Sequence, residues 1–500
     1  MPDLLFITIS SLVSVSVLVP LIIEKRGDSV WDVQKMLNSI FSFFVISMII
    51  ILVIIFIFIP DLLEIFFKDL TLGQYGEEFI KITRILLLSP IILGISSLYG
   101  SIAQSYKKFF VYALSPILYN LGIIVGLIYL YPSFGLEGLA YGVILGAILH
   151  FSILVPSVSG LKLVPKFTFK LDWSLISRIT SLSIPRTITL ASGQLSLLIL
   201  LILAGMMAVG SISVFTLANN LQSVPIALIG ASYSLAAFPA LSQLYTNGQL
   251  SEFIDQFVRA AKHIFFWSIP FIVLFVVLRA QIVRVLFGTG EFTWDDTRLT
   301  AAILAVFSIS IFASALSLLF VRGYYAIGQT IKPLVSAIIS TIITITGALI
   351  FVNLFEVNQS FSDFMEKLLR VDGLTGTSVI ALPLAYSIGV ISNLIMLWVM
   401  FDNKFKNFSN RLWKTVFHIV SASLIMGFVT YLSLNFFADI FNLEVFWGIF
   451  LQGLLAGLIG VFVCGIILIL MGNEEIKVVW HALSRKIWKS RPLVESEENL

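Results

Sequence analysis

Residues 212–242 read ISVFTLANNLQSVPIALIGASYSLAAFPALS, and this stretch decides the fold. It is long enough to cross a bilayer as one helix, because about 20 apolar residues span the hydrocarbon core. Within it, Asn219, Asn220 and Gln222 stand shortly before Pro225. Proline removes a backbone donor and crowds the preceding turn, so we expect a helix kink at Pro225.

A polar patch beside a proline kink has two interpretations. It can face a cavity, or it can form a hydrogen-bond cluster between helices inside a bundle. We favour the cavity, because transporters place interrupted helices at their substrate sites. The small residues that follow Pro225, such as Gly230 and Ala231, allow a neighbouring helix to approach closely.

The composition is that of a polytopic membrane protein. Of 500 residues, 58% are hydrophobic and 12% are charged, and the mean hydropathy is +1.02. Soluble domains average about 25% charged residues. Cys464 is the single cysteine and allows no intrachain disulfide, and the four scattered histidines have no metal-ligand spacing. We therefore expect no metal and no cofactor, and the net charge of +3 does not indicate a nucleic-acid partner.

Hydropathy predicts an all-α protein with about 13 transmembrane helices. The expected spans are 3–23, 38–60, 79–103, 110–131, 136–158, 184–208, 212–242, 260–278, 299–321, 332–354, 374–401, 412–437 and 445–471. Most of the 31 Lys and Arg residues fall in alternate connections. By the positive-inside rule those connections and the C-terminus are cytoplasmic.

Landmarks recur at an offset of about 218 residues, which indicates an internal repeat. Pro20 matches Pro239, and Pro116 matches Pro333. Two six-helix lobes related by a pseudo-twofold axis follow, and the first lobe lacks its first helix. Either the sequence begins at an internal methionine, or the lineage dispenses with this helix; we favour a truncated start. The last two spans have no partner in the repeat.

These observations predict the following organisation. We expect an N-terminal lobe at 1–158, a cytoplasmic linker at 159–183, a C-terminal lobe at 184–401, two additional transmembrane helices at 402–471 and a cytoplasmic amphipathic tail at 472–500.

From residue 38 onward no Asp or Glu lies well inside an expected span, which argues against coupling to protons or sodium through an intramembrane carboxylate. Arg84 and Arg186, in contrast, lie within or at the start of spans. Cations without membrane-embedded acids suit an anionic substrate. Alternatively, Arg84 extends to the interface and Arg186 follows the positive-inside rule.

Sequence motifs for catalysis are missing. There is no P-loop and no Ser-His-Asp pattern. Asp295 and Asp296 could bind a divalent cation in a membrane enzyme that acts on lipid phosphate. We favour a helix cap instead, with Thr293 or Asp295 as the capping residue.

Several runs resemble a known family. They are FTLANNLQSVPIALIG (215–230), RVLFGTGEFTWDDTRLT (284–300), VRGYYAIGQTIKP (321–333), GLEGLAYGVILGAILH (135–150) and the run from Leu86 to Gly126. They are similar to the MurJ/MviN lipid II flippases of the MOP exporter superfamily, and the similarity extends from the start to about residue 401.

The resemblance implies fourteen spans in two lobes around a central cavity in the bacterial cytoplasmic membrane. It implies alternating access for lipid II, an undecaprenyl-pyrophosphate-linked disaccharide peptide used in cell-wall synthesis. It also implies a monomer in contact with membrane lipids, with proteins of wall synthesis as candidate partners. We assign the substrate cavity to Asn219, Asn220, Gln222, Arg84 and Arg186.

The chain departs from familiar family members at a few positions. Asn220 replaces an arginine, Phe6 and Ile7 replace a basic pair, and Leu200 stands where a polar or acidic residue is frequent. The alternative within transport is therefore an exporter of another polyprenyl-linked oligosaccharide.

Overall fold

The computed structural model describes residues 30–67, 76–106, 108–406 and 408–477, together with Leu18 and Ile22. Every regular element in these residues is helical. The chain divides into two compact units, Met1–Ile202 and Leu203–Leu500. Helix α10 (Trp173–Gly205) runs through the boundary between them.

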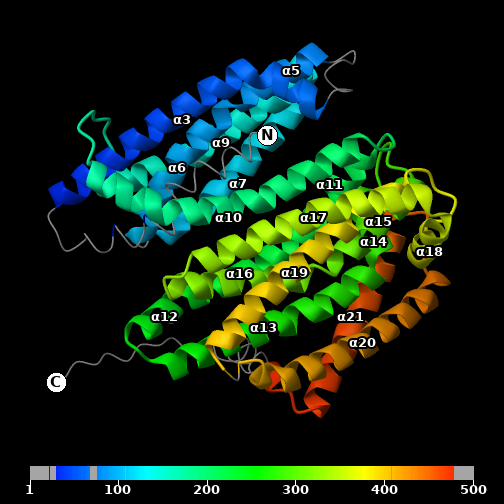
Figure 1. The fold of residues 1–500 in the computed structure, drawn as a ribbon. Coiled ribbons are helices and arrows are strands. Elements are labelled where there is room, and N and C mark those ends of the chain that lie inside the picture. Colours follow the sequence, from blue (N-terminus) through cyan, green and yellow to red (C-terminus); the bar gives the residue numbers. More distant parts are fainter. Residues whose placement is uncertain are drawn as a thin grey trace, which may run out of the picture. The chain divides into compact units, whose positions relative to one another are not determined.

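The first unit holds the helices coloured blue to cyan-green in Figure 1. In chain order they are α3 (Val30–Phe66), α5 (Gly76–Leu86), α6 (Leu88–Ser105), α7 (Phe109–Val125), the π-helical turn η3 (Gly126–Leu130), α8 (Tyr131–Phe134), α9 (Leu136–Ser159) and most of α10.

Helices α7 and α9 pack backbone to backbone through glycines four residues apart. A Cβ atom on Gly122 would lie 2.3 Å from the Cα atom of Gly146, and one on Gly126 would lie 2.4 Å from that of Gly142. Dispersion and small-residue packing replace the hydrophobic effect between helices in lipid, so this close approach is a main source of their association. The same two helices carry part of the stretch that resembles the flippase family.

The connection before α10, residues 160–172, is hydrogen-bonded to polar side chains of α3. Gln34 Nε2 donates to the Val164 carbonyl at 2.6 Å. The backbone N–H of Lys166 donates to Asn38 Oδ1 at 2.7 Å, and that of Thr168 donates to Ser42 Oγ at 2.7 Å. These bonds satisfy extended backbone that has no helix of its own.

The second unit contains the remaining helices. They are α11 (Ser211–Pro225), the π-helical segment η4 (Ile226–Ala231), α12 (Ser232–Thr246), α13 (Leu250–Val277), α14 (Arg279–Phe287), α15 (Trp294–Ser308), α16 (Ile311–Ala326), α17 (Ile331–Val357), α18 (Gln359–Leu369), the 3₁₀ turn η5 (Thr377–Ile380), α19 (Ala381–Lys404), α20 (Asn410–Ala438) and α21 (Phe446–Leu470).

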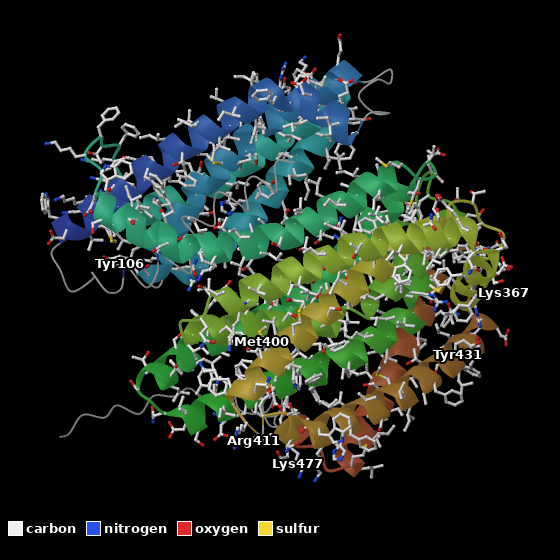
Figure 2. The ribbon with its side chains drawn as sticks, viewed as in Figure 1. Tyr106, Lys367, Met400, Arg411, Tyr431 and Lys477 are labelled. Atoms are coloured by element: carbon white, nitrogen blue, oxygen red, sulfur yellow. The ribbon has the colours of Figure 1, made fainter. Side chains whose placement is uncertain are left out.

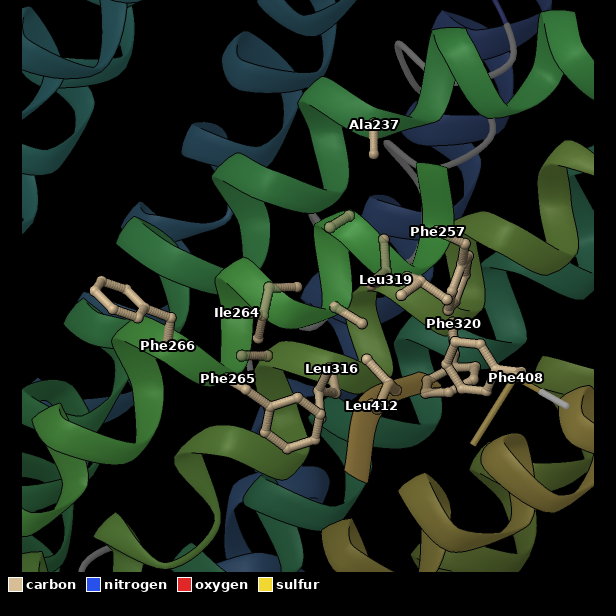
Figure 3. Close-up of a cluster of buried hydrophobic side chains, with 14 of the residues drawn as sticks. Ala237, Phe257, Ile264, Phe265, Phe266, Leu316, Leu319, Phe320, Phe408 and Leu412 are labelled. Carbon is tan, nitrogen blue, oxygen red and sulfur yellow. The ribbon is translucent and has the colours of Figure 1, made fainter. Parts of the chain in front are cut away.

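An aromatic cluster joins α13, α16 and α19 (Figure 3). The rings of Phe257 and Phe401 stack with centroids 4.3 Å apart, and Phe320 and Phe408 pack against both. Gly323 makes room for it, because a Cβ atom there would lie 2.5 Å from the Phe257 ring. Such offset and edge contacts add about 0.5–1.5 kcal/mol each to the burial of the rings.

The last two helices, α20 and α21, pack on α13 and α14. Gly427 on α20 lies against Val273, and Gly460 on α21 lies against Thr430. Gln452 on α21 accepts from Gln281 on α14 and donates to a carbonyl of α20 at 2.9 Å. Arg411 forms an ion pair with Asp255 at the other end of α20. These helices are therefore an integral part of the second unit.

The described residues contain 11 helices long and apolar enough to cross a membrane, or 12 if one bent pair counts as a span. The expected all-α polytopic fold is confirmed, and each of the twelve expected spans after residue 38 has a counterpart. The thirteenth span, 3–23, lies outside the described residues apart from Leu18 and Ile22, and so does the tail from residue 478. The count of thirteen therefore stays a prediction.

Two expected boundaries differ from the structure. The span expected at 299–321 is a pair of helices, α15 and α16, which meet at a bend of 40°. No proline lies at the bend; hydrophobicity alone therefore does not reveal it. The second part of the linker expected at 159–183 is helical, because α10 begins at Trp173. The two-lobe repeat and its domain limits stay predictions.

The α7–α9 contact generates a stability prediction. In Gly146→Ala the new Cβ atom would lie 2.4 Å from the Tyr119 carbonyl oxygen, so we expect a loss of about 1–3 kcal/mol. Gly193→Ala on α10 is the matched control, because nothing lies within 4 Å of its Cβ position. Thermal unfolding in detergent should show a lower midpoint for Gly146→Ala only. Equal midpoints for the two variants would contradict the close-packed interface.

Candidate functional site

The polar residues of α11 are joined to the bend between α15 and α16. Gln222 is 1% exposed, and its Nε2 donates to Asn219 Oδ1 at 3.0 Å. The hydroxyl of Ser310 lies 3.1 Å from Gln222 Oε1 and 2.8 Å from the Phe307 carbonyl. Its single proton is shared between these two acceptors. Gln222 therefore tethers α11 to the helix break.

This arrangement bears on the cavity hypothesis, which stays a prediction. Gln222 is buried in the contact between α11, α15 and α16, which is the helix–helix cluster that we considered less favoured. Asn219 is half-buried and serves as its acceptor. Asn220 is exposed, so it is the member of the patch that is open to a ligand. Composition and hydropathy do not separate these roles, because the burial of each side chain depends on where α16 packs.

Pro225 is the last residue of α11, and a π-helical segment follows it directly; the kink expected at Pro225 stays a prediction. The chain continues as η4 and then α12, and the whole of Ser211–Thr246 remains one span. A π-helical segment widens the turn, and such segments are frequent at functional sites. Gly230 in η4 lies against α16, where a Cβ atom would be 2.6 Å from the Cα atom of Ala315. The expected close approach at Gly230 is therefore confirmed.

Arg84 lies in the first unit, on α5 within the span Gly76–Ser105. Its guanidinium stacks over the ring of Phe56 on α3, with 4.9 Å from Cζ to the ring centroid. The buried Nε atom of Arg84 makes no hydrogen bond within the described part of the chain. A guanidinium that is oriented by an aromatic face and retains a free donor is suited to an anion.

Arg186 also lies in the first unit, one residue after Pro185 in α10. It is half-buried. The candidate residues thus come from both units, with Arg84 and Arg186 before the boundary and the α11 residues after it. Their joint role as a cavity stays a prediction.

The acidic pair at the start of α15 is a helix cap. Thr293 accepts from the Asp296 N–H at 3.2 Å, and Asp296 Oδ2 accepts from the Thr293 N–H at 2.9 Å. This capping box confirms the favoured interpretation, with Thr293 as the capping residue. Within the described ranges no group of three His, Cys, Asp or Glu side chains could hold a metal ion. The interpretation as a lipid-phosphate enzyme loses its one supporting feature.

The second unit has two hollows. One of about 200 Å³ lies at the start of α11, lined by Gly210, Ser211, Asp295 and the loop Gly373–Gly376 among others. The other, of about 350 Å³, lies among α13, α14 and α21 and has almost entirely apolar walls, which include Ile282 and Leu454. Neither contains Asn219, Asn220 or Gln222.

One ionic contact was not expected from the sequence. His263 Nδ1 on α13 lies 2.9 Å from a carboxylate oxygen of Glu475, which is 6% exposed. The His263 ring stacks on Tyr233 of α12, whose hydroxyl accepts from Trp267 Nε1 at 3.0 Å. The segment after α21 thereby folds back onto α12 and α13. Glu475 follows the last apolar span, so the sequence placed it in the expected amphipathic tail.

The sequence matches a family model described as "Lipid II flippase MurJ" over residues 1–451. A protein of Burkholderia cenocepacia named "Lipid II flippase MurJ" is 24% identical over 56% of this chain and 56% of its own length. A probable lipid II flippase MurJ of Buchnera aphidicola (from Acyrthosiphon pisum) is 23% identical over 79% of this chain and 72% of its own length. The matched regions span about half the length of the first of these curated relatives.

Solved structures show the same fold. The structure titled "Lipid II flippase MurJ, inward closed conformation" superimposes with a TM-score of 0.68 and 24% identity, over 92% of this chain and 91% of that chain. An inward-facing multidrug resistance MATE family transporter of the MOP superfamily superimposes with a TM-score of 0.63 and 17% identity, over 82% of this chain and 89% of that chain. At these identities the likeness establishes the fold.

The different roles of Gln222 and Asn220 generate a prediction. Gln222→Ala leaves the Asn219 carbonyl and the Ser310 hydroxyl without their buried partner, so we expect a loss of about 1–3 kcal/mol in unfolding free energy. Asn220→Ala is the matched control, because an exposed side chain contributes within about 0.5 kcal/mol. Thermal unfolding of both variants in detergent separates them. Equal destabilisation would show that Asn220 is as tightly packed as Gln222.

Proposed function

The chain belongs to the lipid II flippase MurJ family, and from this we propose that it moves lipid II from the inner to the outer leaflet of the bacterial cytoplasmic membrane. The observation that carries the proposal is the family match over residues 1–451. The MurJ-like fold over 92% of the chain is consistent with it. On this proposal the protein is a transporter and not an enzyme.

The charge pattern supports an anionic substrate. Arg84 offers a guanidinium with an unbonded Nε atom inside a membrane span. A pyrophosphate accepts such donors in charge-assisted hydrogen bonds, which are stronger than bonds between neutral groups. Asn220, exposed on α11, adds neutral amide donors at a position where the resemblance to the family implies an arginine. We propose that Arg84, Arg186, Asn219 and Asn220 contribute to binding of the anionic substrate. Gln222 instead positions the α11 residues through its hydrogen bonds to Asn219 and Ser310.

Alternating access requires an element that changes shape while its ends stay packed. The span Ser211–Thr246 has such an element in η4, which is held to α16 by Gly230 and tied to the α15–α16 bend by Gln222. We propose that η4 and the bend adjust together as the transporter opens toward either side. The helices on both sides of these irregular segments can then move as rigid bodies.

A second candidate is export of another polyprenyl-linked oligosaccharide. Asn220 favours it, because an amide at this position binds a doubly charged pyrophosphate less strongly than an arginine would. In both cases we propose a cytoplasmic C-terminus. Arg411 and Lys477, which the positive-inside rule assigns to the cytoplasm, lie at the end of the second unit opposite Lys367 and Tyr431 (Figure 2). We further propose that the protein acts as a monomer, with wall-synthesis proteins as its partners.

Complementation tests the function. A bacterial strain depleted of its own lipid II flippase should regain growth when this chain is produced in its membrane. Growth failure with normal membrane levels of the protein, together with rescue by a flippase of known activity, would contradict lipid II as the substrate. Rescue of a strain that lacks the exporter of a different polyprenyl-linked glycan would instead support the second candidate.

Arg84 provides the sharper molecular prediction. Loss of a charge-assisted hydrogen bond worth about 1.5–3 kcal/mol should weaken lipid II binding by about 10- to 100-fold in Arg84→Ala, and Arg84→Lys should restore part of it. Lys81→Ala is the matched control on the same helix, because Lys81 is paired with Glu137. Native mass spectrometry of the purified proteins measures the retained lipid. Unchanged retention in Arg84→Ala would leave Arg84 as an interface anchor.

A further inference from the structure

The chain changes direction directly after α21. The turn is at Gly472, whose φ of +68° lies in the left-handed region that glycine adopts without strain. The N–H of Gly472 donates to the Ile469 carbonyl at 3.0 Å, and the N–H of Asn473 donates to the Leu468 carbonyl at 3.0 Å. These two bonds are those of a Schellman motif, which ends a helix and satisfies its last carbonyls. The direction in which the chain leaves α21 is therefore set by the backbone.

Residues 472–477, which we call the strap, are held by three further contacts. Asn473 is 3% exposed, and its Oδ1 accepts from the Glu475 N–H at 2.9 Å, so it caps the helical turn at 474–477. Ile476 packs against the buried hydrophobic cluster of the second unit that contains the rings of α13, α16 and α19. Glu475, which is nearly buried, contacts His263 on α13. The strap is thus part of the packed structure.

A carboxylate withdrawn from water requires a hydrogen-bond donor, and His263 supplies one to Glu475. Oε2 of Glu475 lies 2.9 Å from Nδ1 of His263, so this ring nitrogen carries the proton. A hydrogen bond to an ionised carboxylate is stronger than one between neutral groups, and loss of the donor leaves the carboxylate without compensation for its burial. The bond also fixes the orientation of the His263 ring.

The oriented His263 ring connects the strap to α12. Helices α12 and α13 follow each other in the chain and pack side by side (Figure 1). The face of the His263 ring stacks on the ring of Tyr233, with centroids 5.5 Å apart and ring planes inclined by 17°. The Tyr233 hydroxyl accepts from Trp267 Nε1 at 3.0 Å, one turn further along α13. Tyr233 is therefore held by α13 through both its ring and its hydroxyl.

Tyr233 stands where the π-helical segment ends. The last residue of η4 is Ala231, and Tyr233 is the second residue of α12. Within η4, Gly230 lies against Ala315 of α16. Contacts to two different helices, α16 and then α13, thus follow one another within three residues at the end of the widened turn. A change of shape in η4 must displace Tyr233 from His263 or move α13 with it.

We propose that the strap is a conformational restraint on η4 and α12. Through His263 and Tyr233, Glu475 stabilises the arrangement of this span that the structure shows, and release of the strap lets the span change shape. The purpose of this restraint rests on the proposed transport function, whereas the restraint itself is a property of the packing. Helices α20 and α21, which have no partner in the expected repeat, then serve to bring the strap to α13. His263 and Glu475 are positioning residues that act through Tyr233.

Hydrogen–deuterium exchange of the purified full chain in detergent tests the restraint. In Glu475→Ala, the amides of residues 226–238 should exchange about tenfold faster or more, because local opening no longer has to break the charge-assisted bond. Glu475→Gln should show a smaller increase, since its amide oxygen accepts the same bond without the charge. Glu474→Ala and Glu474→Gln are the matched controls, because Glu474 is the exposed neighbour in the strap, and they should exchange as the unsubstituted protein does.

His263→Phe separates the ring from its donor. This variant keeps an aromatic ring against Tyr233 but lacks Nδ1, so exchange in residues 226–238 should rise as in Glu475→Ala. The double variant should rise no further than the single ones, because both changes remove the same bond. Exchange in α7 and α9, which belong to the first unit, should stay unchanged in every variant and so shows that the effect is local.

Three results would overturn the strap. They are unchanged exchange of residues 226–238 in both Glu475→Ala and His263→Phe, increases that add in the double variant, and a uniform increase over both units. If Glu475→Ala does not accumulate, Glu475→Gln against Glu474→Gln gives the same comparison. The exchange measurement needs no substrate. Failure of the unsubstituted chain to move lipid II in liposomes would therefore contradict the proposed function alone, and unchanged exchange would contradict the strap alone.

Discussion

Within hydrocarbon, a buried polar group must find its partner inside the protein, because no water is present to replace it. The irregular segments of this chain follow that constraint. At the bend between α15 and α16, Ser310 and Gln222 bond to each other. Where α14, α20 and α21 meet, Gln281 and Gln452 bond in the same way. At these two places a pair of polar side chains thus stabilises the departure from straight apolar helices.

The same constraint explains what could be predicted from the sequence. Hydropathy located the spans after residue 38, because each must be long and apolar whatever its neighbours are. The cap at Thr293 was predictable, since its partners lie three residues away. The burial of Gln222 was not, because Ser310 is 88 residues distant and its role appears only when α16 packs against η4. The bend at Ile309 was not predictable either, because it contains no proline. The burial of Glu475 depends on its contact with His263, which lies more than 200 residues earlier in the sequence.

The surroundings of Pro225 show how much a local prediction leaves open. Proline does interrupt the α-helical hydrogen bonds, but the interruption is absorbed by η4, and the span continues to Thr246. The segment is anchored on one side by the Gly230–Ala315 contact and on the other by Gln222. A π-helical segment between two anchors is a suitable place for a change of shape in a transporter, because its wider turn can be redistributed without breaking the flanking helices.

Translocation of lipid II can be measured directly in liposomes. The purified chain is reconstituted into liposomes that carry lipid II in both leaflets, and a membrane-impermeant hydrolase that cleaves the pyrophosphate linkage is added outside. We predict that cleavage proceeds from the outer-leaflet share to nearly all of the lipid II, at a rate that rises with the amount of protein. Cleavage that stops at the outer-leaflet share, as in protein-free liposomes, while a flippase of known activity moves the lipid in parallel, would contradict the proposed function.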